Sequence, residues 1–171
     1  MLVSNKVEWK FQNLKSVIHD ILSFKGIKMI TIHESDRYVE LINLFIENEL
    51  EFSEKDKLIP DSVVKYWEAL DDEKLIGGCV LGLREGVYVL EGIATDADYR
   101  KKRVGKQLLC EALTYLKTLG AKKLYLCARA PGFFKTQGFL EIDRENAPNF
   151  GCINCDQFGI KCFPEIMMKN L

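Results

Sequence analysis

The chain has 171 residues, which suggests one domain and leaves little room for a second. Hydrophobic residues make up 47% and charged residues 29%, so the chain can build a packed core and does not have a disordered composition. The formal net charge is −1, from 24 Lys and Arg against 25 Asp and Glu, and this balance argues against a nucleic-acid binder.

Membrane insertion and secretion are not expected either. The longest apolar run, residues 75–83, is far shorter than the ~20 residues needed to cross a bilayer. The first six residues lack the apolar stretch of a signal peptide, which predicts a cytoplasmic protein. Six cysteines in that compartment are more typical of thiols or metal ligands than of a disulfide framework.

Residues 1–27 are predicted to form an N-terminal extension to a main domain over 28–171. Apolar and polar residues alternate over 7–11, which indicates a short strand, and the apolar spacing from Leu14 to Leu22 predicts an amphipathic helix. An exposed apolar face on that helix would favour a homodimer.

The first half of the main domain starts with an expected strand at 29–33. Ser35 or Asp36 is predicted to cap a helix whose apolar residues fall between 41 and 46. An acidic, lysine-containing loop is expected over 47–57. Residues 64–70 indicate a strand, with a short helix at 61–66 as the alternative.

The second half has clearer patterns. Strands are predicted at 75–83 and 87–95, then a helix over 105–119 ended by Gly120, a strand at 123–127 and a short helix over 131–137 ended by Gly138. Strands at 139–142 and 165–169 complete the chain. Hairpins that give way to alternating strands and helices predict a mixed α/β sheet.

Residues 93–106 combine a strand end, a polar turn, a basic run and the first turn of a strong helix. A helix N-terminus exposes unpaired N–H groups and the positive end of the helix dipole, so it attracts phosphate. Arg100, Lys101, Lys102 and Arg103 are consecutive, and Lys106 follows closely. The segment predicts a local anion site, with a solvated basic turn as the alternative.

Two motifs around the predicted 105–119 helix carry a family resemblance. Arg100-Lys101-Lys102-Arg103-Val104-Gly105 matches Gln/Arg-x-x-Gly-x-Gly/Ala, and Phe133-Phe134 with Gly138-Phe139 matches an aromatic pair and a later Gly-Phe. In this order and spacing, over about residues 28–142, the chain resembles the GNAT superfamily of acetyl-CoA-dependent N-acetyltransferases.

The resemblance implies a splayed, mostly antiparallel sheet flanked by helices, with acetyl-CoA in the wedge between the 87–95 and 123–127 strands. It implies that the acetyl group passes directly to the primary amine of a small molecule, with an amino acid among the candidates. The pantetheine arm would pair with the main chain of the 93–95 segment, and the diphosphate would lie on the amides of 101–106. The implied cofactor-binding residues are Ile93, Ala94, Thr95, Arg100, Lys101, Lys102, Arg103, Val104, Gly105, Lys106 and Phe134.

Two positions depart from the family pattern. Arg103 stands where the family has its first loop glycine, and it can still donate its backbone N–H if its φ is ordinary, so cofactor binding is expected to survive. Phe134 stands where many members have a tyrosine that protonates the departing thiolate. Another group or water would then supply the proton, or the thiolate would leave unassisted, which its pKa near 8–9 allows.

Glu91 is the candidate general base, since an amine acceptor is mostly protonated at neutral pH. Glu91, Ile93 and Thr95 alternate onto one strand face unless a bulge intervenes. The alternative is that Glu91 orients the substrate or pairs with a nearby lysine.

The C-terminal loop over 152–162 contains Cys152-x-x-Cys155 and Cys162, and two such sulfurs can share a metal ion. Cys127 or Asp156 could add a fourth ligand, so zinc, a reversible disulfide and unmodified thiols all remain open. In the implied fold this loop lies beside the acceptor pocket and residues 49–60 form the opposite wall. The acidic residues Glu47, Glu49, Glu51 and Glu54 would there favour a cationic acceptor.

Two other functions stay open. The chain could be an acyl-CoA-binding regulator without turnover, which Arg103 and Phe134 motivate, or a metal- or redox-responsive module built on the cysteines.

Overall fold

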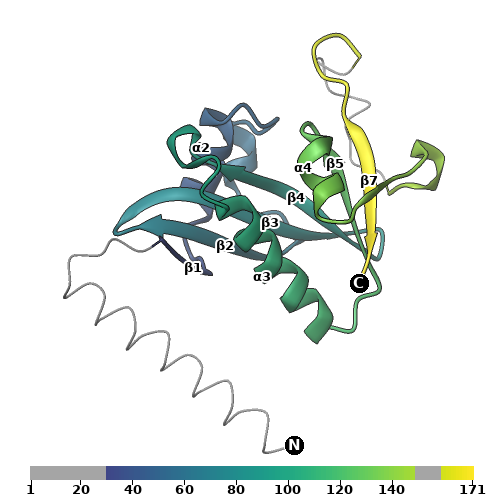
Figure 1. Ribbon diagram of the computed structural model, residues 1–171, viewed down its shortest axis with the longest axis horizontal. Helices are drawn as coiled ribbons and strands as arrows, with labels where there is room; N and C mark the ends of the chain where they lie inside the picture. Colours follow the sequence, from purple (N-terminus) through teal and green to yellow (C-terminus); the bar gives the residue numbers. More distant parts are fainter. Residues whose placement is uncertain (1–29, 149–158) are drawn as a thin grey trace, which may run out of the picture.

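The computed structural model describes residues 30–148 and 159–171. Seven strands form one sheet in the order β1-β2-β3-β4-β5-β7-β6 (Figure 1). Among the described pairings only β4 with β5 is parallel, and the other five are antiparallel, which confirms the expected mixed sheet. The strands are β1 (Ile30–Glu34), β2 (Val63–Asp71), β3 (Lys74–Arg84), β4 (Val87–Thr95), β5 (Lys123–Ala128), β6 (Leu140–Glu141) and β7 (Glu165–Asn170).

Helices cover both faces of this sheet. The α-helices are α2 (Tyr38–Glu47), α3 (Val104–Thr118) and α4 (Pro131–Thr136), and the 3-10 helices are η1 (Glu54–Lys57), η2 (Ala97–Tyr99) and η3 (Arg144–Asn146). On one face α3 buries Leu108, Leu109 and Leu116 against β2, β3 and β5. On the other face α2 buries Leu41, Ile42 and Phe45 against β3 and β4. The apolar periodicity of each helix therefore sets the face that it presents to the sheet.

Most expected elements lie within one or two residues of their predicted bounds, and three regions differ. The 47–57 segment contains η1, whose Ser53 and Asp56 form a capping box. Residues 61–66 do not form the alternative helix, because Val63 already belongs to β2. The strand predicted at 139–142 is reduced to β6. The expected extension 1–27, with its strand, helix and dimer contact, lies outside the described residues.

The predicted cap of α2 is wrong. The helix starts at Tyr38 after Arg37, and neither Ser35 nor Asp36 caps it. Ser35 Oγ instead accepts the amide of Arg37 (3.0 Å) and donates to the carboxylate of Glu68 (3.1 Å), which Arg37 also binds (2.8 Å). Glu68 is buried, so satisfying its charge takes precedence over capping the helix.

Gly120 and Gly138 end their helices as predicted. Both have positive φ (+70° and +79°) and stand one residue beyond the last helical turn. After α3, Ala121 N donates to Leu116 O, and after α4, Phe139 N donates to Phe134 O, each at 3.1 Å. This bond pattern is the Schellman motif, in which the left-handed residue is usually glycine.

The sheet opens between β4 and β5. These strands pair only at Val89↔Tyr125 and Leu90↔Leu126 in the described part of the chain, whereas β4 continues to Thr95. A β-bulge starts there, because Val80 pairs with Gly92 and the next residue of β3 pairs with Leu90. Since a bulge bends its strand and increases the local twist, it turns the end of β4 away from β5.

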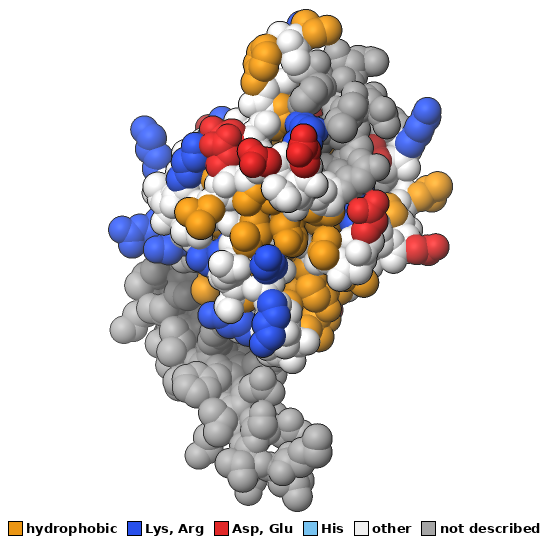
Figure 2. Space-filling model, turned by 90° about the vertical axis from the view of Figure 1, so that its right-hand side faces the viewer, with side chains coloured by type: hydrophobic (Ala, Val, Ile, Leu, Met, Phe, Trp, Pro, Cys, Tyr) orange, Lys and Arg blue, Asp and Glu red, His pale blue; other side chains and the backbone are white. Residues whose placement is uncertain are grey.

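Exposed apolar side chains gather on the side of the molecule where β6 and β7 end the sheet. Leu140, Ile160 and Phe163 are each more than 60% exposed, and Figure 2 shows hydrophobic side chains across the middle and at the upper tip of this side. No helix in residues 30–148 or 159–171 is long and apolar enough to cross a membrane.

The turn between β4 and α3 contains two residues in the left-handed region. Lys101 has φ +74° and Arg103 has φ +63°, and Arg103 is the residue that precedes α3. The condition of an ordinary φ for Arg103 is therefore not met, and this position has a glycine-like conformation. This conformation costs roughly 1–2 kcal/mol for a residue with a Cβ.

Replacing Arg103 by glycine should therefore stabilise the protein. We expect Arg103→Gly to raise the free energy of unfolding by about 0.5–1 kcal/mol, measured by urea denaturation, because glycine adopts this φ without strain. Lys102→Gly is the matched control, since Lys102 does not have a positive φ, and it should lower stability. Equal effects of the two substitutions would contradict the assigned backbone strain.

Candidate functional site

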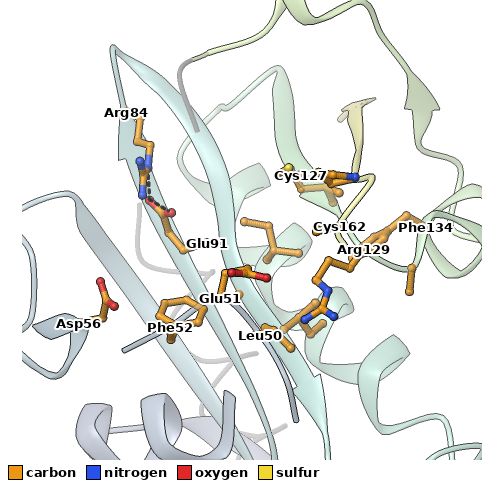
Figure 3. A pocket seen from close by; sticks show the side chains of 16 residues that line it. Leu50, Glu51, Phe52, Asp56, Arg84, Glu91, Cys127, Arg129, Phe134 and Cys162 are labelled. Atoms are coloured by element: carbon orange, nitrogen blue, oxygen red, sulfur yellow. Dashed lines mark hydrogen bonds and ion pairs between the residues drawn. The ribbon is translucent and has the colours of Figure 1, made fainter. Parts of the chain in front are cut away.

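Two adjoining cavities open where β4 and β5 part. The larger, the basic groove, has a volume of about 700 Å³. The smaller, the mixed-charge pocket, has a volume of about 450 Å³ (Figure 3). Five residues line both cavities: Leu50, Ile93, Arg129, Ala130 and Phe134. The two cavities therefore meet at the opening in the sheet.

The basic groove brings together most of the residues predicted to hold the cofactor. Its walls include the end of β4, the β4–α3 turn, the first turn of α3, and α4. The predicted residues among them are Ile93, Ala94, Thr95, Arg100, Lys101, Arg103, Val104, Gly105, Lys106 and Phe134. Lys102 does not line the groove, and its ammonium group lies 4.1 Å from the centre of the Tyr99 ring.

Polar contacts to β2 and β3 hold the basic turn in place. Lys74 Nζ lies 2.9 Å from Asp96 Oδ2, and Tyr99 donates its hydroxyl to Asp71 Oδ2 (2.6 Å). The hydrogen bond from Lys74 lowers the pKa of Asp96, and the bond to Asp71 raises the pKa of the Tyr99 hydroxyl. Asp96 and Tyr99 flank η2, so both ends of this short helix are fixed to the turn between β2 and β3.

The start of α3 presents unpaired amides to the groove. Lys102 N donates to Tyr99 O (3.2 Å), whereas the amides of residues 103–106 have no backbone acceptor in the part of the chain that the structure describes. Gly105 faces the groove, because a Cβ added there would lie 3.5 Å from Thr95 Oγ1 and 3.7 Å from the Phe133 ring. Amides without backbone acceptors, a helix dipole and four cations from the turn and the first turn of α3 line this part of the groove, an environment that suits an anion.

The mixed-charge pocket contains Glu91 together with residues of the predicted 49–60 wall. The segment between α2 and η1 supplies Leu50, Glu51 and Phe52, and η1 supplies Asp56. Of the four glutamates expected in the 49–60 wall region, Glu51 lines this pocket and Glu49 lines the basic groove. Cys162 and Pro164 line the other side of the pocket, as expected for the C-terminal loop.

The β-bulge puts Glu91 and Ile93 on opposite faces, so the expected regular alternation is wrong. Ile93 packs against the cluster around α3. Glu91 lies against Gly82, where any Cβ would collide with its carboxylate, on the face that β3 presents to α2. Residues from both faces reach the pocket, because the sheet is open at this point.

Arg84 binds the carboxylate of Glu91 with two hydrogen bonds. Arg84 Nε donates to Oε1 and a terminal nitrogen donates to Oε2, each at 2.7 Å (Figure 3). The Glu91 side chain is 12% exposed and the Arg84 side chain 37%, so water is largely excluded from the carboxylate but still reaches the arginine. The alternative named from the sequence was pairing with a nearby lysine, whereas the partner is Arg84 on the neighbouring strand.

Tyr38 lies behind the acidic side of the pocket. Burial, together with the charges of Asp56 and Glu91, raises the pKa of its hydroxyl to about 12. The phenol is therefore protonated at neutral pH, but it does not line either cavity. It acts as a neutral packing group beneath the two carboxylates.

Phe134 sits at the junction of the two cavities. It is buried, and its ring packs edge-on against Phe133 and Phe139 at centroid distances of 5.0 and 5.6 Å. The aromatic pair and the Gly-Phe of the second motif therefore form one cluster at the end of α4. Tyr99, whose hydroxyl is bonded to Asp71, is the one tyrosine among the lining residues of the two cavities.

Two cysteines also line the mixed-charge pocket. Cys127 comes from β5 and Cys162 from the segment before β7 (Figure 3). Cys152 and Cys155, the other predicted ligands, lie outside the described residues. Across residues 30–148 and 159–171 there is no group of three or more His, Cys, Asp and Glu side chains that could hold a metal ion.

Arg84 and Arg129 are site residues that sequence reasoning missed. Arg84 pairs with Val87 across the hairpin and Glu91 is the bulge residue further along β4, so cross-strand spacing in the sequence did not indicate the Arg84–Glu91 pair. Arg129 follows directly after β5, and nothing in its sequence neighbourhood distinguishes it from a surface arginine.

Solved structures of acetyltransferases share this fold. A GNAT-family acetyltransferase from Staphylococcus aureus Mu50 is 22% identical, with a TM-score of 0.65, over 84% of this chain and 99% of its own. The N-acetylglutamate synthase of Neisseria gonorrhoeae, complexed with coenzyme A and N-acetylglutamate, is 15% identical, with a TM-score of 0.66, over 84% of this chain and 35% of its own. The ribosomal-protein-S18-alanine N-acetyltransferase of Escherichia coli is 20% identical, with a TM-score of 0.62, over 83% and 94%.

The family itself is identified from the sequence. No curated protein matches the chain. The model of the acetyltransferase (GNAT) family matches residues 29–139, which include the sheet opening, the basic turn and the aromatic cluster. The chain therefore belongs to the acetyltransferase (GNAT) family, the acetyl-CoA-dependent N-acetyltransferases.

Proposed function

We propose that the protein transfers the acetyl group of acetyl-CoA directly to the primary amine of a small molecule. The observation that carries this proposal is the junction of two cavities of different chemistry at the opening of the sheet. One cavity offers cations and free helix amides, and the other offers carboxylates. A diphosphate fits the first environment, and an ammonium group fits the second.

The basic groove fits acetyl-CoA by its donor groups. The amides of residues 103–106 and the side chains of Arg100, Lys101, Arg103 and Lys106 would hold the diphosphate. From Glu91 to Thr95, β4 has no strand partner on the β5 side in the described residues, so its backbone groups there are available to the amides of the pantetheine arm. Phe134 would lie beside the thioester, at the junction of the cavities.

Glu91 is the proposed base for the acceptor amine. An amine must lose a proton before it attacks a thioester carbon, and a carboxylate can accept this proton directly or through one water molecule. Arg84 fixes the carboxylate in one orientation in the pocket wall. The attacking nitrogen then forms the amide bond as the carbon–sulfur bond breaks and the thiolate departs.

The departing thiolate needs no acid from the protein. Phe134 has no proton to give, and a thiol of pKa near 8–9 is a good leaving group at neutral pH. Water at the mouth of the groove can protonate the thiolate after it leaves.

The second candidate function is an acyl-CoA-binding regulator without turnover. Both carboxylate oxygens of Glu91 already accept hydrogen bonds from Arg84, which favours a structural role for this residue. Tight binding of acetyl-CoA without release of CoA across a broad panel of amines would support the regulator.

The cofactor site is tested by a charge reversal at the helix start. Gly105→Glu should lower the affinity for CoA by about 5- to 1,000-fold in calorimetry, since it places a carboxylate against the diphosphate at a cost of about 1–4 kcal/mol. Gly105→Ala is the control, because its Cβ has room beside Thr95 Oγ1 at 3.5 Å. Unchanged affinity in a folded Gly105→Glu variant would contradict the proposed cradle.

The role of Glu91 is tested by comparing the loss of its carboxylate with the loss of its ion pair to Arg84. Glu91→Gln should lower kcat/KM about 100-fold at neutral pH, and the loss should shrink at higher pH as free amine accumulates. Arg84→Gln breaks the same ion pair but keeps the carboxylate, so it should retain most of the activity. Equal losses in both variants would show that Glu91 acts only through its pairing with Arg84.

We also propose that the C-terminal cysteines bind zinc. The presence of Cys127 and Cys162 in the lining of one pocket supports this proposal, and Cys152 and Cys155 are the remaining ligands suggested by sequence. Metal analysis of the purified protein should find about one zinc per chain, reduced in Cys162→Ser but not in Cys110→Ser, which changes an exposed cysteine of α3. Purified protein without zinc would contradict this proposal, and a reversible disulfide or unmodified thiols would remain as the alternatives.

A further inference from the structure

Arg129 is a cation of the mixed-charge pocket that has no partner among the residues that the structure describes. It makes no hydrogen bond or ion pair in residues 30–148 and 159–171. Arg84, the other arginine of the pocket, binds the carboxylate of Glu91 with two hydrogen bonds. Much of the remaining lining is apolar, including Leu90, Ile93 and Leu126. A guanidinium beside such a lining is well placed to bind an anion that enters the pocket.

Arg129 lies on a different side of the pocket from Glu91 and Asp56, and Glu51 lies between them (Figure 3). Glu91 and Asp56 lie with Arg84 on one side, and Arg129 lies near Phe134 on the other (Figure 3). Asp56 already accepts hydrogen bonds from Ser53 N and Ser53 Oγ (2.7 and 2.8 Å), so it is fixed on its side. A ligand that spans the pocket therefore meets the carboxylates of Glu91 and Asp56 at one end. At the other end it meets the guanidinium of Arg129, which has no partner in residues 30–148 and 159–171.

We propose that the acceptor carries a carboxylate close to its amine, as an amino acid does, and that Arg129 binds this carboxylate. The proposal rests on the proposed acetyl transfer and names the substrate class of the same site. The ammonium end would lie toward Glu91 and the carboxylate toward Arg129. The volume of about 450 Å³ accommodates a molecule of this size.

Recognition of a carboxylate by arginine has a measurable effect on affinity. A charge-assisted hydrogen bond from arginine to a carboxylate changes affinity by about 10- to 100-fold. Arg129 also lines the basic groove, so it could instead touch CoA or the thioester carbonyl. Contact with CoA would raise the KM for acetyl-CoA in an Arg129 variant, and contact with the thioester would lower kcat equally for every amine.

The experiment compares matched pairs of acceptors in the full-length enzyme. Each pair is an amino acid and the amine left by removal of its carboxylate: lysine with cadaverine, phenylalanine with phenethylamine, and leucine with isoamylamine. CoA release gives kcat/KM for each acceptor in the wild type, Arg129→Gln, Arg129→Lys and Lys117→Gln. The last variant removes an exposed charge of α3 that lies outside both cavities. Because the two members of a pair differ in basicity, the ratio within a pair is compared between variants, which cancels this difference.

We expect at least one pair in which the wild type prefers the amino acid. In Arg129→Gln that preference should fall about 10- to 100-fold, with the KM for acetyl-CoA unchanged, and Arg129→Lys should keep part of it. Lys117→Gln should behave like the wild type. An equal loss of kcat on both members of each pair, or a raised KM for acetyl-CoA alone, would overturn the proposal.

The failure of this proposal can be told from the failure of the proposed function. Acetylation of amines without carboxylates, with ratios that Arg129→Gln leaves unchanged, overturns the role of Arg129 and keeps the transferase. Binding of acetyl-CoA in calorimetry without transfer to any acceptor overturns both and points to the regulator.

Discussion

The parting of β4 from β5 is the constraint on which the rest of the site depends. The two strands pair in parallel at only two positions, and the bulge at Glu91 then turns β4 away. Backbone groups inside a sheet normally satisfy one another, so an opening leaves donors and acceptors that need other partners. The opening also joins the two faces of the sheet, which is why a groove beside α3 and a pocket beside η1 can share Leu50, Ile93 and Phe134.

The basic turn shows how a strained backbone is kept in place. Lys101 and Arg103 both adopt left-handed conformations without glycine. Contacts of Asp96 and Tyr99 with the turn between β2 and β3 fix the preceding segment, and α3 is packed against the sheet by its leucines. With both ends fixed, the short connection has little conformational freedom. The strain then serves to aim free amides into the groove.

In the mixed-charge pocket, hydrogen-bond partners fix the positions of two carboxylates. Glu91 is held by Arg84 and Asp56 by Ser53. These contacts fix the carboxylates as parts of the wall, so the position of each one matters more than the total acidity of the 47–57 segment. Arg129 has no such contact in the described residues, so its guanidinium is available for the proposed binding of a carboxylate.

The sequence by itself determined the order of the elements, the helix ends at Gly120 and Gly138, the basic turn before α3 and the family. These features depend on local spacing, glycine conformation and short motifs, which lie within a few residues of one another. Only the tertiary structure decided the face of Glu91 and its pairing with Arg84, because a bulge is set by the register against a neighbouring strand. The tertiary structure also places Arg129 and Glu91 in the lining of one pocket. The sequence does not indicate this, because Glu91 lies on β4 and Arg129 directly after β5, on either side of the opening in the sheet.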